Sequence, residues 1–175
     1  GDFSVAMGQF NTASGNNSVA LGNNATASAY GSFAVGAFLI QANGSHSFAQ
    51  GRYSYADGNY SVVLGGQYSE ANGNFSTVMG ASSDADGDHS LAKGRFAQAL
   101  GDYSLAFGQS AEATGEYSIS IGRQIIVGSG TAGDGAGDNS LGFGLLSNTV
   151  LNANRPQITG DRAAVFFFDQ NTANA

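Results

Sequence analysis

A unit with a period of about 14 residues recurs along most of this chain, and a fixed period of this kind predicts a repeat architecture. Its copies begin at Gly1, Gly15, Ala29, Gly44, Gly58, Gly73, Gly87, Gly101, Gly115 and Gly137. Most copies share this length, those at Ala29 and Gly58 are longer by one position, and the one at Gly115 is longer by eight. The fourth position is Ser and the eighth is Gly in all ten copies.

Each unit contains two short stretches with the alternation that is typical of β-strands. The first runs from position 3 to position 8, and the second follows a Gly corner and ends in Ala in most copies. Helix is disfavoured, because Gly recurs about every seven residues and each interior Gly costs ~1 kcal/mol relative to Ala. The pattern predicts an all-β fold, a parallel β-solenoid with two strands per coil.

The alternation divides the side chains of the first strand between two faces. Positions 4, 6 and 8 carry Ser, mostly Ala, and Gly, and they share one face, while positions 5 and 7 share the other. A coil this short folds back on itself so closely that only small side chains fit inside it. We therefore expect Ser, Ala and Gly inside, with each Ser hydroxyl bonded to backbone at a neighbouring corner, because an unpaired buried hydroxyl is costly.

The large side chains at positions 5 and 7 then form an apolar stripe outside the coil. Seventeen of the twenty are apolar, and at ~4.8 Å per coil the stripe extends roughly 48 Å. A soluble monomer rarely exposes so large a patch, and covering it is worth roughly 25–50 kcal/mol per chain as an upper bound. We expect an obligate, parallel homo-oligomer with the stripe along its symmetry axis. The expected interface residues are Val5, Met7, Val19, Leu21, Val35, Val62, Leu64, Leu91, Leu105, Phe107, Ile119 and Ile121.

Gln50 and Lys93 interrupt this stripe. In a cyclic oligomer their copies would meet near the axis. We expect both side chains to bend aside or to lie among waters, and the alternative is an anion bound at the level of Lys93.

Composition excludes several classes of function. The 175 residues carry six Lys and Arg against 13 Asp and Glu, for a net charge of −7. Nucleic-acid affinity depends on clustered basic residues that release counterions, so no nucleic-acid partner is expected. There is no Cys, hence no disulfide. No apolar run approaches the ~20 residues that cross a bilayer, so we expect no direct membrane contact by this segment. The repeat starts at Gly1 without a leader, so an exported protein would be represented here by a mature piece or an excerpt.

Motifs for chemistry are weak. The stretch at 128–133 has the glycine spacing of a dinucleotide site, but no helix can follow it. Asp84, Asp86 and Asp88 could offer oxygens to calcium, yet they lack the EF-hand spacing and a closing Glu. His46 and His89 lie three coils apart, too far to share a metal, and packing at a subunit seam explains them. We expect no catalytic residues, no metal and no cofactor.

Recognition can be sought at two places on the surface. Exposed aromatic residues on a rigid sheet can anchor a protein or sugar ligand. We expect such residues to point outward from the second strand, namely Phe10, Tyr53, Tyr55, Tyr68 and Phe96. The other place is residues 123–136, which we interpret as a loop that expands one coil, because insertions on solenoids often carry recognition.

The stretch Asn-Ser-Val-Ala-Leu-Gly at 17–22 and its variants at 4–8, 61–65, 104–108 and 118–122 resemble the repeat of the YadA-like head of trimeric autotransporter adhesins. The resemblance covers about residues 1–144. It implies a left-handed parallel β-roll, a homotrimer with threefold symmetry, and display on the bacterial outer membrane. The implied role is non-enzymatic adhesion, a virulence function in pathogens, through a host extracellular-matrix protein or surface glycan.

Similar heads also occur in phage and viral tail fibres, so a structural or receptor-binding segment of a virion tail fibre is the alternative. The expected organisation is a β-roll head of ten coils over residues 1–150, with the insertion at 123–136. Residues 151–175 are expected to form a cap or connector, because the open end of a solenoid invites edge pairing.

Overall fold

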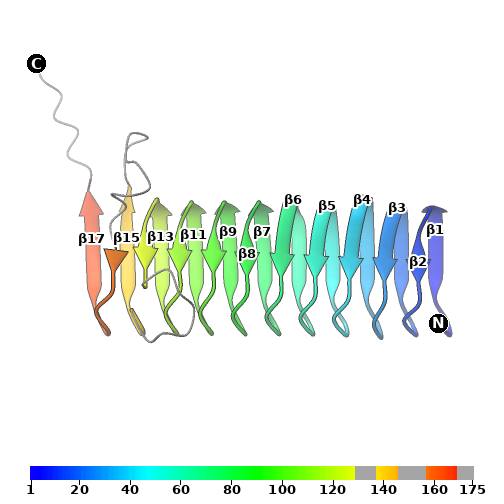
Figure 1. Cartoon of the computed structure of the whole chain (residues 1–175), viewed down its shortest axis with the longest axis horizontal. Helices are drawn as coiled ribbons and strands as arrows, with labels where there is room; N and C mark the ends of the chain where they lie inside the picture. The colour runs from blue at the N-terminus through cyan, green and yellow to red at the C-terminus, as the bar shows by residue number, and fades with distance from the viewer. Residues whose placement is uncertain (129–136, 146–156, 169–175) are drawn as a thin grey trace, which may run out of the picture.

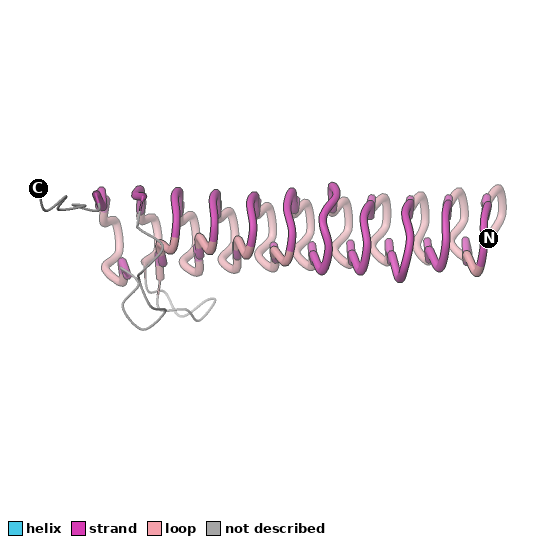
Figure 2. The backbone as a smooth tube through the Cα atoms, turned by 90° about the horizontal axis from the view of Figure 1, so that it is seen from above, coloured by secondary structure: helices cyan, strands magenta, loops and turns pink. Residues whose placement is uncertain are grey.

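The chain winds into a narrow parallel β-solenoid. A computed structural model describes residues 1–128, 137–145 and 157–168. Figure 1 shows the first strands of successive coils running in one direction and the short second strands running in the other. The view from above in Figure 2 shows the backbone advancing along the roll by one narrow loop per coil. The predicted all-β parallel solenoid with two strands per coil is confirmed.

Each of the ten sequence units supplies a first strand, and in four units this strand continues around the corner into the second. The continuous strands are β3 (Val19–Ala27), β4 (Phe33–Ala42), β5 (Phe48–Ala56) and β6 (Val62–Ala71). The separate first strands are β1 (Val5–Gln9), β7 (Thr77–Ala81), β9 (Leu91–Arg95), β11 (Leu105–Gln109), β13 (Ile119–Arg123), β15 (Leu141–Leu145) and, beyond the ten units, β17 (Ala164–Phe168). The separate second strands are β2 (Thr12–Ala13), β8 (Asp84–Ala85), β10 (Gln98–Ala99), β12 (Glu112–Ala113), β14 (Ile126–Val127) and β16 (Gln157–Ile158).

The register of the stack follows the sequence repeat, so equivalent positions of neighbouring units lie side by side. Strands β1 and β3 pair in parallel with Val5 beside Val19, and β11 and β13 pair with Leu105 beside Ile119. Register shifts occur in the pairings of β4 and β6, the strands of the two units that are longer by one position. In the unit that begins at Gly58, the corner after the first strand contains Gly65 and Gly66, both with positive φ (71° and 92°).

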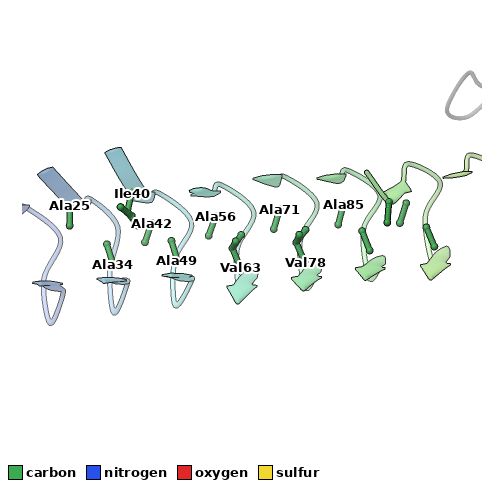
Figure 3. Close-up of a cluster of buried hydrophobic side chains, with 14 of the residues drawn as sticks. Ala25, Ala34, Ile40, Ala42, Ala49, Ala56, Val63, Ala71, Val78 and Ala85 are labelled. Atoms are coloured by element: carbon green, nitrogen blue, oxygen red, sulfur yellow. The ribbon is translucent and has the colours of Figure 1, made fainter. Parts of the chain in front are cut away.

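The interior is filled by small side chains, as expected. Position 6 is occupied mostly by fully buried Ala, and Figure 3 shows side chains of both strands pointing into the space between them. Larger residues occur where the other strand of the coil supplies a smaller one. Val63 shares its coil with Ser69, and Ser120 shares its coil with Ile125. Because the coil has a nearly fixed internal volume, a larger side chain on one strand is accompanied by a smaller side chain on the other.

The prediction that the Gly at position 8 fills the interior is wrong for most coils. Gly22 is exposed, and its backbone has a φ of 122°. A Cβ built on Gly22 would lie 1.9 Å from the carbonyl oxygen of Gly36 in the next coil. Glycine is therefore required here because neighbouring coils approach each other backbone to backbone, and not because of the interior volume.

The prediction for the serine hydroxyls holds for only part of the column. The Oγ atoms of Ser4, Ser18 and Ser32 donate to a carbonyl three residues earlier, at 2.6–2.8 Å, and Ser140 donates to Gly160 at 2.7 Å. Six further hydroxyls are buried without a hydrogen-bond partner, and for these the prediction is wrong. They belong to Ser47, Ser61, Ser76, Ser90, Ser104 and Ser118. The interior that excludes large side chains also keeps these hydroxyls from water.

Each coil turns at two corners, and non-glycine residues take a left-handed conformation at both. His46 and Tyr60 at position 3 have φ of 57°, and Tyr53 at position 10 has φ of 51°. This conformation is uncommon for residues other than Gly and Asn. The stack supports it, because the N–H of Tyr60 donates to the carbonyl of Ser45 in the preceding coil at 2.8 Å.

The C-terminal part of the described chain continues the ladder. Strand β14 pairs with β12, although residues 126–127 fall inside the expected insertion, because Ile125 and Val127 fill the coil interior. Residues 129–136 of that insertion lie outside the described residues. Strand β16 pairs with β14, and β17 pairs with β15, so the described part of 151–175 adds strands to both sides of the roll.

Candidate functional site

The expected apolar stripe lies on one outer face of the roll, which we call the apolar face. It comprises the side chains at positions 5 and 7 of the first strands. Met7, Leu64 and Phe107 are exposed by 64%, 39% and 44%, and Leu105 is half-buried between its neighbours in the stack. The prediction that these large side chains point away from the coil interior is confirmed. Among the described residues, no strand covers this face.

Gln50 and Lys93, which interrupt the apolar face, are both exposed. Lys93 extends along the face, and its Nζ lies 5.3 Å from the ring centroid of Phe107 in the next coil. An ammonium group at this distance from a ring gains a cation–π interaction. Lys93 thus bends toward a neighbouring side chain of the same chain.

A column of rings runs along the edge beside position 3, next to the apolar face. Consecutive ring centroids in this column are 4.8–5.2 Å apart, and most pairs are stacked within 6° of parallel. The column consists of Tyr30, His46, Tyr60, Phe75, His89, Tyr103 and Tyr117. Each imidazole is held between two aromatic rings. Because His46 and His89 are separated by Tyr60 and Phe75, the two do not converge on one site.

The same edge carries a column of Asn and acidic side chains at position 2, which we call the acidic edge. A side-chain oxygen at this position accepts a hydrogen bond from the backbone N–H of position 2 in the preceding coil. The N–H of Asn74 donates to Asp88 (2.7 Å), that of Asp88 to Asp102 (2.9 Å), and that of Glu116 to Asp138 (2.7 Å). These bonds tie neighbouring coils together in the fixed register.

The opposite edge, at positions 9 and 10, carries rings and guanidinium groups, and we call it the arginine edge. The guanidinium carbon of Arg52 lies 4.9 Å from the ring centroid of Phe38 and 5.1 Å from that of Tyr53, while Tyr53 stacks on Tyr68 at 4.9 Å. Further along, Arg95 lies 4.7 Å from the ring centroid of Phe96.

Four of the five residues expected on the second strand share this edge. Phe10, Tyr53, Tyr68 and Phe96 all have left-handed φ between 51° and 58°. They occupy the corner between the two strands, which for Tyr53 and Tyr68 lies within the continuous strands β5 and β6, and this corrects their expected position. The reason is that the coil bends at position 10, before the outward position of the second strand at position 12.

Only Tyr55 of the five lies on the outer face of the second strand, in register with Glu70. Asp84 follows Glu70 in the same column, and its carboxylate accepts a hydrogen bond from Nε2 of Gln98 at 3.4 Å. Partial burial raises the pKa of Asp84, and the charges of Asp86 and Glu70 add to this, while the hydrogen bond from Gln98 opposes it. The outer face of the second strands therefore carries acidic and polar side chains, in contrast to the apolar face on the first strands.

The arrangement of the acidic and histidine side chains gives no support to a metal site. Within the described ranges, no three acidic or histidine side chains come together in a way that could hold a metal ion. The glycine-rich stretch at 128–133 lies almost wholly outside the described residues. Within those same ranges, no helix is long and apolar enough to span a membrane.

Sequence reasoning missed both edges as continuous features. The stacking of the rings at position 3 and the hydrogen bonds at position 2 depend on the register between coils. A usable signal was present, because a residue type that recurs at one position of a solenoid unit must lie in a column.

Comparison with known families gives one result. A family model described as the YadA head domain repeat (2 copies) matches residues 1–25, 13–38, 42–67, 71–97 and 99–124. These matches cover most of the chain up to residue 124. A comparison with curated proteins finds none that matches.

Proposed function

Because the chain belongs to the YadA head family, we propose that it is the non-enzymatic head of a trimeric adhesin. In this proposal three copies assemble in parallel as left-handed rolls, with residues 1–150 as the head and 151–175 as a connector or cap. The head is displayed on the outer surface of a bacterial cell. It attaches that cell to a host extracellular-matrix protein or a surface glycan.

The observation that carries the proposal is the apolar face. Its side chains point away from a coil interior that Ala and Ser already fill, so refolding within one subunit cannot bury them. Association around a threefold axis would remove Val19, Leu21, Leu105 and Phe107 from water together with the other residues predicted for the interface. The subunit therefore favours an obligate assembly, because a soluble monomer rarely exposes so large an apolar surface.

The arginine edge offers the proposed ligand surface. Tyr53 and Tyr68 present stacked rings, with Arg52 placed between Tyr53 and Phe38. Tyr55 lies two residues further along the same strand, and Phe10 and Phe96 occupy the same edge in other coils. Aromatic and Arg side chains are common anchors in interfaces. Three copies per head would convert a weak contact into avid attachment.

The assembly is tested by placing charge on the apolar face. Leu105→Asp with Phe107→Asp brings six carboxylates toward the axis of a trimer, and we expect light scattering to detect monomer or aggregate in place of trimer. Thr26→Asp, on the outer face of the roll, is the matched control and should remain trimeric. A trimer that tolerates both aspartates would overturn the proposed interface.

The ligand surface is tested separately on the intact trimer. We expect Tyr53→Ala with Tyr68→Ala to lower retention on immobilised matrix proteins, glycans or whole host cells by more than tenfold, because each head loses three copies of the patch. Ser82→Ala, at the same corner in another coil, should bind as the unaltered head does. Unchanged binding by the double variant would exclude this patch while leaving the assembly in place.

A further inference from the structure

The basic residues of the roll are confined to one side of each coil. In residues 1–128 they are Arg52, Lys93, Arg95 and Arg123, and all four lie on first strands. The three arginines occupy position 9, the last position before the corner, and their register places Gln109 between Arg95 and Arg123. This column contains no acidic residue over the same range. The arginine edge therefore carries positive charge on a chain that is acidic as a whole.

The acidic edge lies at the other end of the same strands. Asp88, Asp102 and Glu116 occupy position 2 of three consecutive coils, and Asp2 holds this position in the first coil. Seven residues of extended chain, roughly 23 Å, separate position 2 from position 9. The two edges therefore cannot pair within one coil of one subunit. Moreover, Nε of Arg123 is buried and has no hydrogen-bond partner among the described residues.

A parallel ring brings these two edges together. When the apolar faces of identical rolls surround a common axis, the position-9 end of each face meets the position-2 end of the next. Position 9 shares its face with positions 5 and 7, whereas the rings of the proposed ligand surface lie past the bend, at position 10 and beyond. Rotation about the axis moves no residue along it, so each coil meets the same coil of its neighbour. An antiparallel face-to-face pair would instead oppose one arginine column to another, which like-charge repulsion disfavours.

Resting on the proposed trimer, we propose that its seams are closed by charge pairs between identical coils of neighbouring subunits. Arg95 pairs with Asp88 of the neighbouring subunit, and Arg123 pairs with Glu116 of the neighbouring subunit. In the coil between them, Gln109 faces Asp102 of the neighbouring subunit. The apolar face drives association, while the pairs fix parallel orientation and axial register, since charge complementarity contributes more to specificity than to affinity.

The pairing is tested by cysteine cross-linking, for which the chain is suited because it contains no Cys. Arg95→Cys with Asp88→Cys, treated with a short thiol-reactive bismaleimide that replaces the reach of the arginine side chain, should give a covalent trimer in denaturing gels. The control is Arg95→Cys with Glu116→Cys, whose sites lie two coils apart, roughly 10 Å along the axis. That axial offset adds to the lateral distance between the two sulfurs, and we expect far less cross-linked trimer than from the test pair.

The outcomes separate the seam from the assembly. A trimer in light scattering that forms no covalent trimer overturns the charge pairs and leaves the proposed trimer standing. A control that cross-links as fully as the test pair overturns the same-coil register. A monomer in light scattering overturns both the seam and the assembly on which it rests.

A second experiment measures the charge pair itself without removing the ladder of hydrogen bonds. Asp88→Asn keeps an oxygen that accepts from Asn74, and Asn already occupies this position in the coil of Asn74. We expect Arg95→Gln and Asp88→Asn each to lower the urea midpoint of trimer dissociation, and the double variant to fall no further. Arg52→Gln is the control, because Ser45 holds position 2 of its coil. Additive effects of the two changes would overturn the pair.

Discussion

At the scale of single residues, the interior of the roll imposes a strict limit on volume and a loose one on hydrogen bonding. Ala106 is fully buried, and Gly142 leaves space that Val127 and Ile125 occupy, since a Cβ built there would lie 2.7 Å from Val127 Cγ2 and 2.9 Å from Ile125 Cγ2. By contrast, the serine column contains both bonded and unbonded hydroxyls. Serine at position 4 therefore satisfies a requirement for size at every coil and a requirement for a hydrogen bond at only some.

This difference predicts opposite effects for two identical substitutions. Ser18→Ala removes a 2.6 Å hydrogen bond to the carbonyl of Gly15, and we expect it to lower the free energy of unfolding by about 1 kcal/mol. Ser104→Ala removes a buried hydroxyl without a partner, and we expect it to leave stability unchanged or to raise it. Urea denaturation of both variants checks this. Equal losses would show that the two hydroxyls are equivalent.

At the scale of strands, stacking identical positions places like side chains in contact along the whole roll. The arrangement stabilises the columns of rings and of Asn, because stacked rings and amides attract one another. In the outer column of the second strands it brings Glu70 beside Asp84. There the register that the packed core imposes brings two carboxylates of like charge side by side, which is unfavourable.

Asp84 therefore lowers stability at neutral pH. Its pKa is raised above 3.8, chiefly by burial, so the folded state binds a proton more tightly than the unfolded chain does. The free energy of unfolding then decreases as pH rises from about 3.8 through the raised pKa. We expect Asp84→Asn to raise the thermal midpoint at pH 7, and the gain to shrink as pH falls toward 3.8.

The control for this prediction is Asp57→Asn, which alters an exposed carboxylate and should show a smaller effect. A gain for Asp84→Asn that is independent of pH would mean that its charge is not the cause.

At the scale of the whole molecule, a roll with a constant register is close to one-dimensional, and each coil contacts mainly its two neighbours. Coils are then interchangeable if their length is preserved. Removal of residues 101–114, one complete unit, leaves Leu91 to pair with Ile119 in the positions that Leu105 held between them. The roll should remain intact and become shorter.

We expect this deletion variant to fold and unfold cooperatively, with small-angle scattering showing a head shorter by about 4.8 Å. Deletion of residues 101–107 alone removes the first three residues of β11 and keeps the second strand β12, so we expect loss of the folded head. A folded half-unit variant, or an unfolded full-unit variant, would contradict the one-dimensional description.

The sequence by itself determined the period, the strands and the direction of the side chains. Ser at position 4 and large residues at positions 5 and 7 recur along the units, so backbone alternation puts them on opposite faces. The short coil has room inside for the small side chains alone, which decides which face is inside. The apolar face followed for the same reason.

Only the tertiary structure decided what lies in contact between coils. The carbonyl of Gly36 beside Gly22, the column of rings that holds His46 and His89, and the partners of the serine hydroxyls all depend on how closely one coil stacks on the next. It also placed Phe10, Tyr53, Tyr68 and Phe96 on a corner with the arginines and not on the second strand. Alternation gives a direction only within a strand, and where the chain turns, the hydrogen bonds to the neighbouring coil decide where a side chain lies.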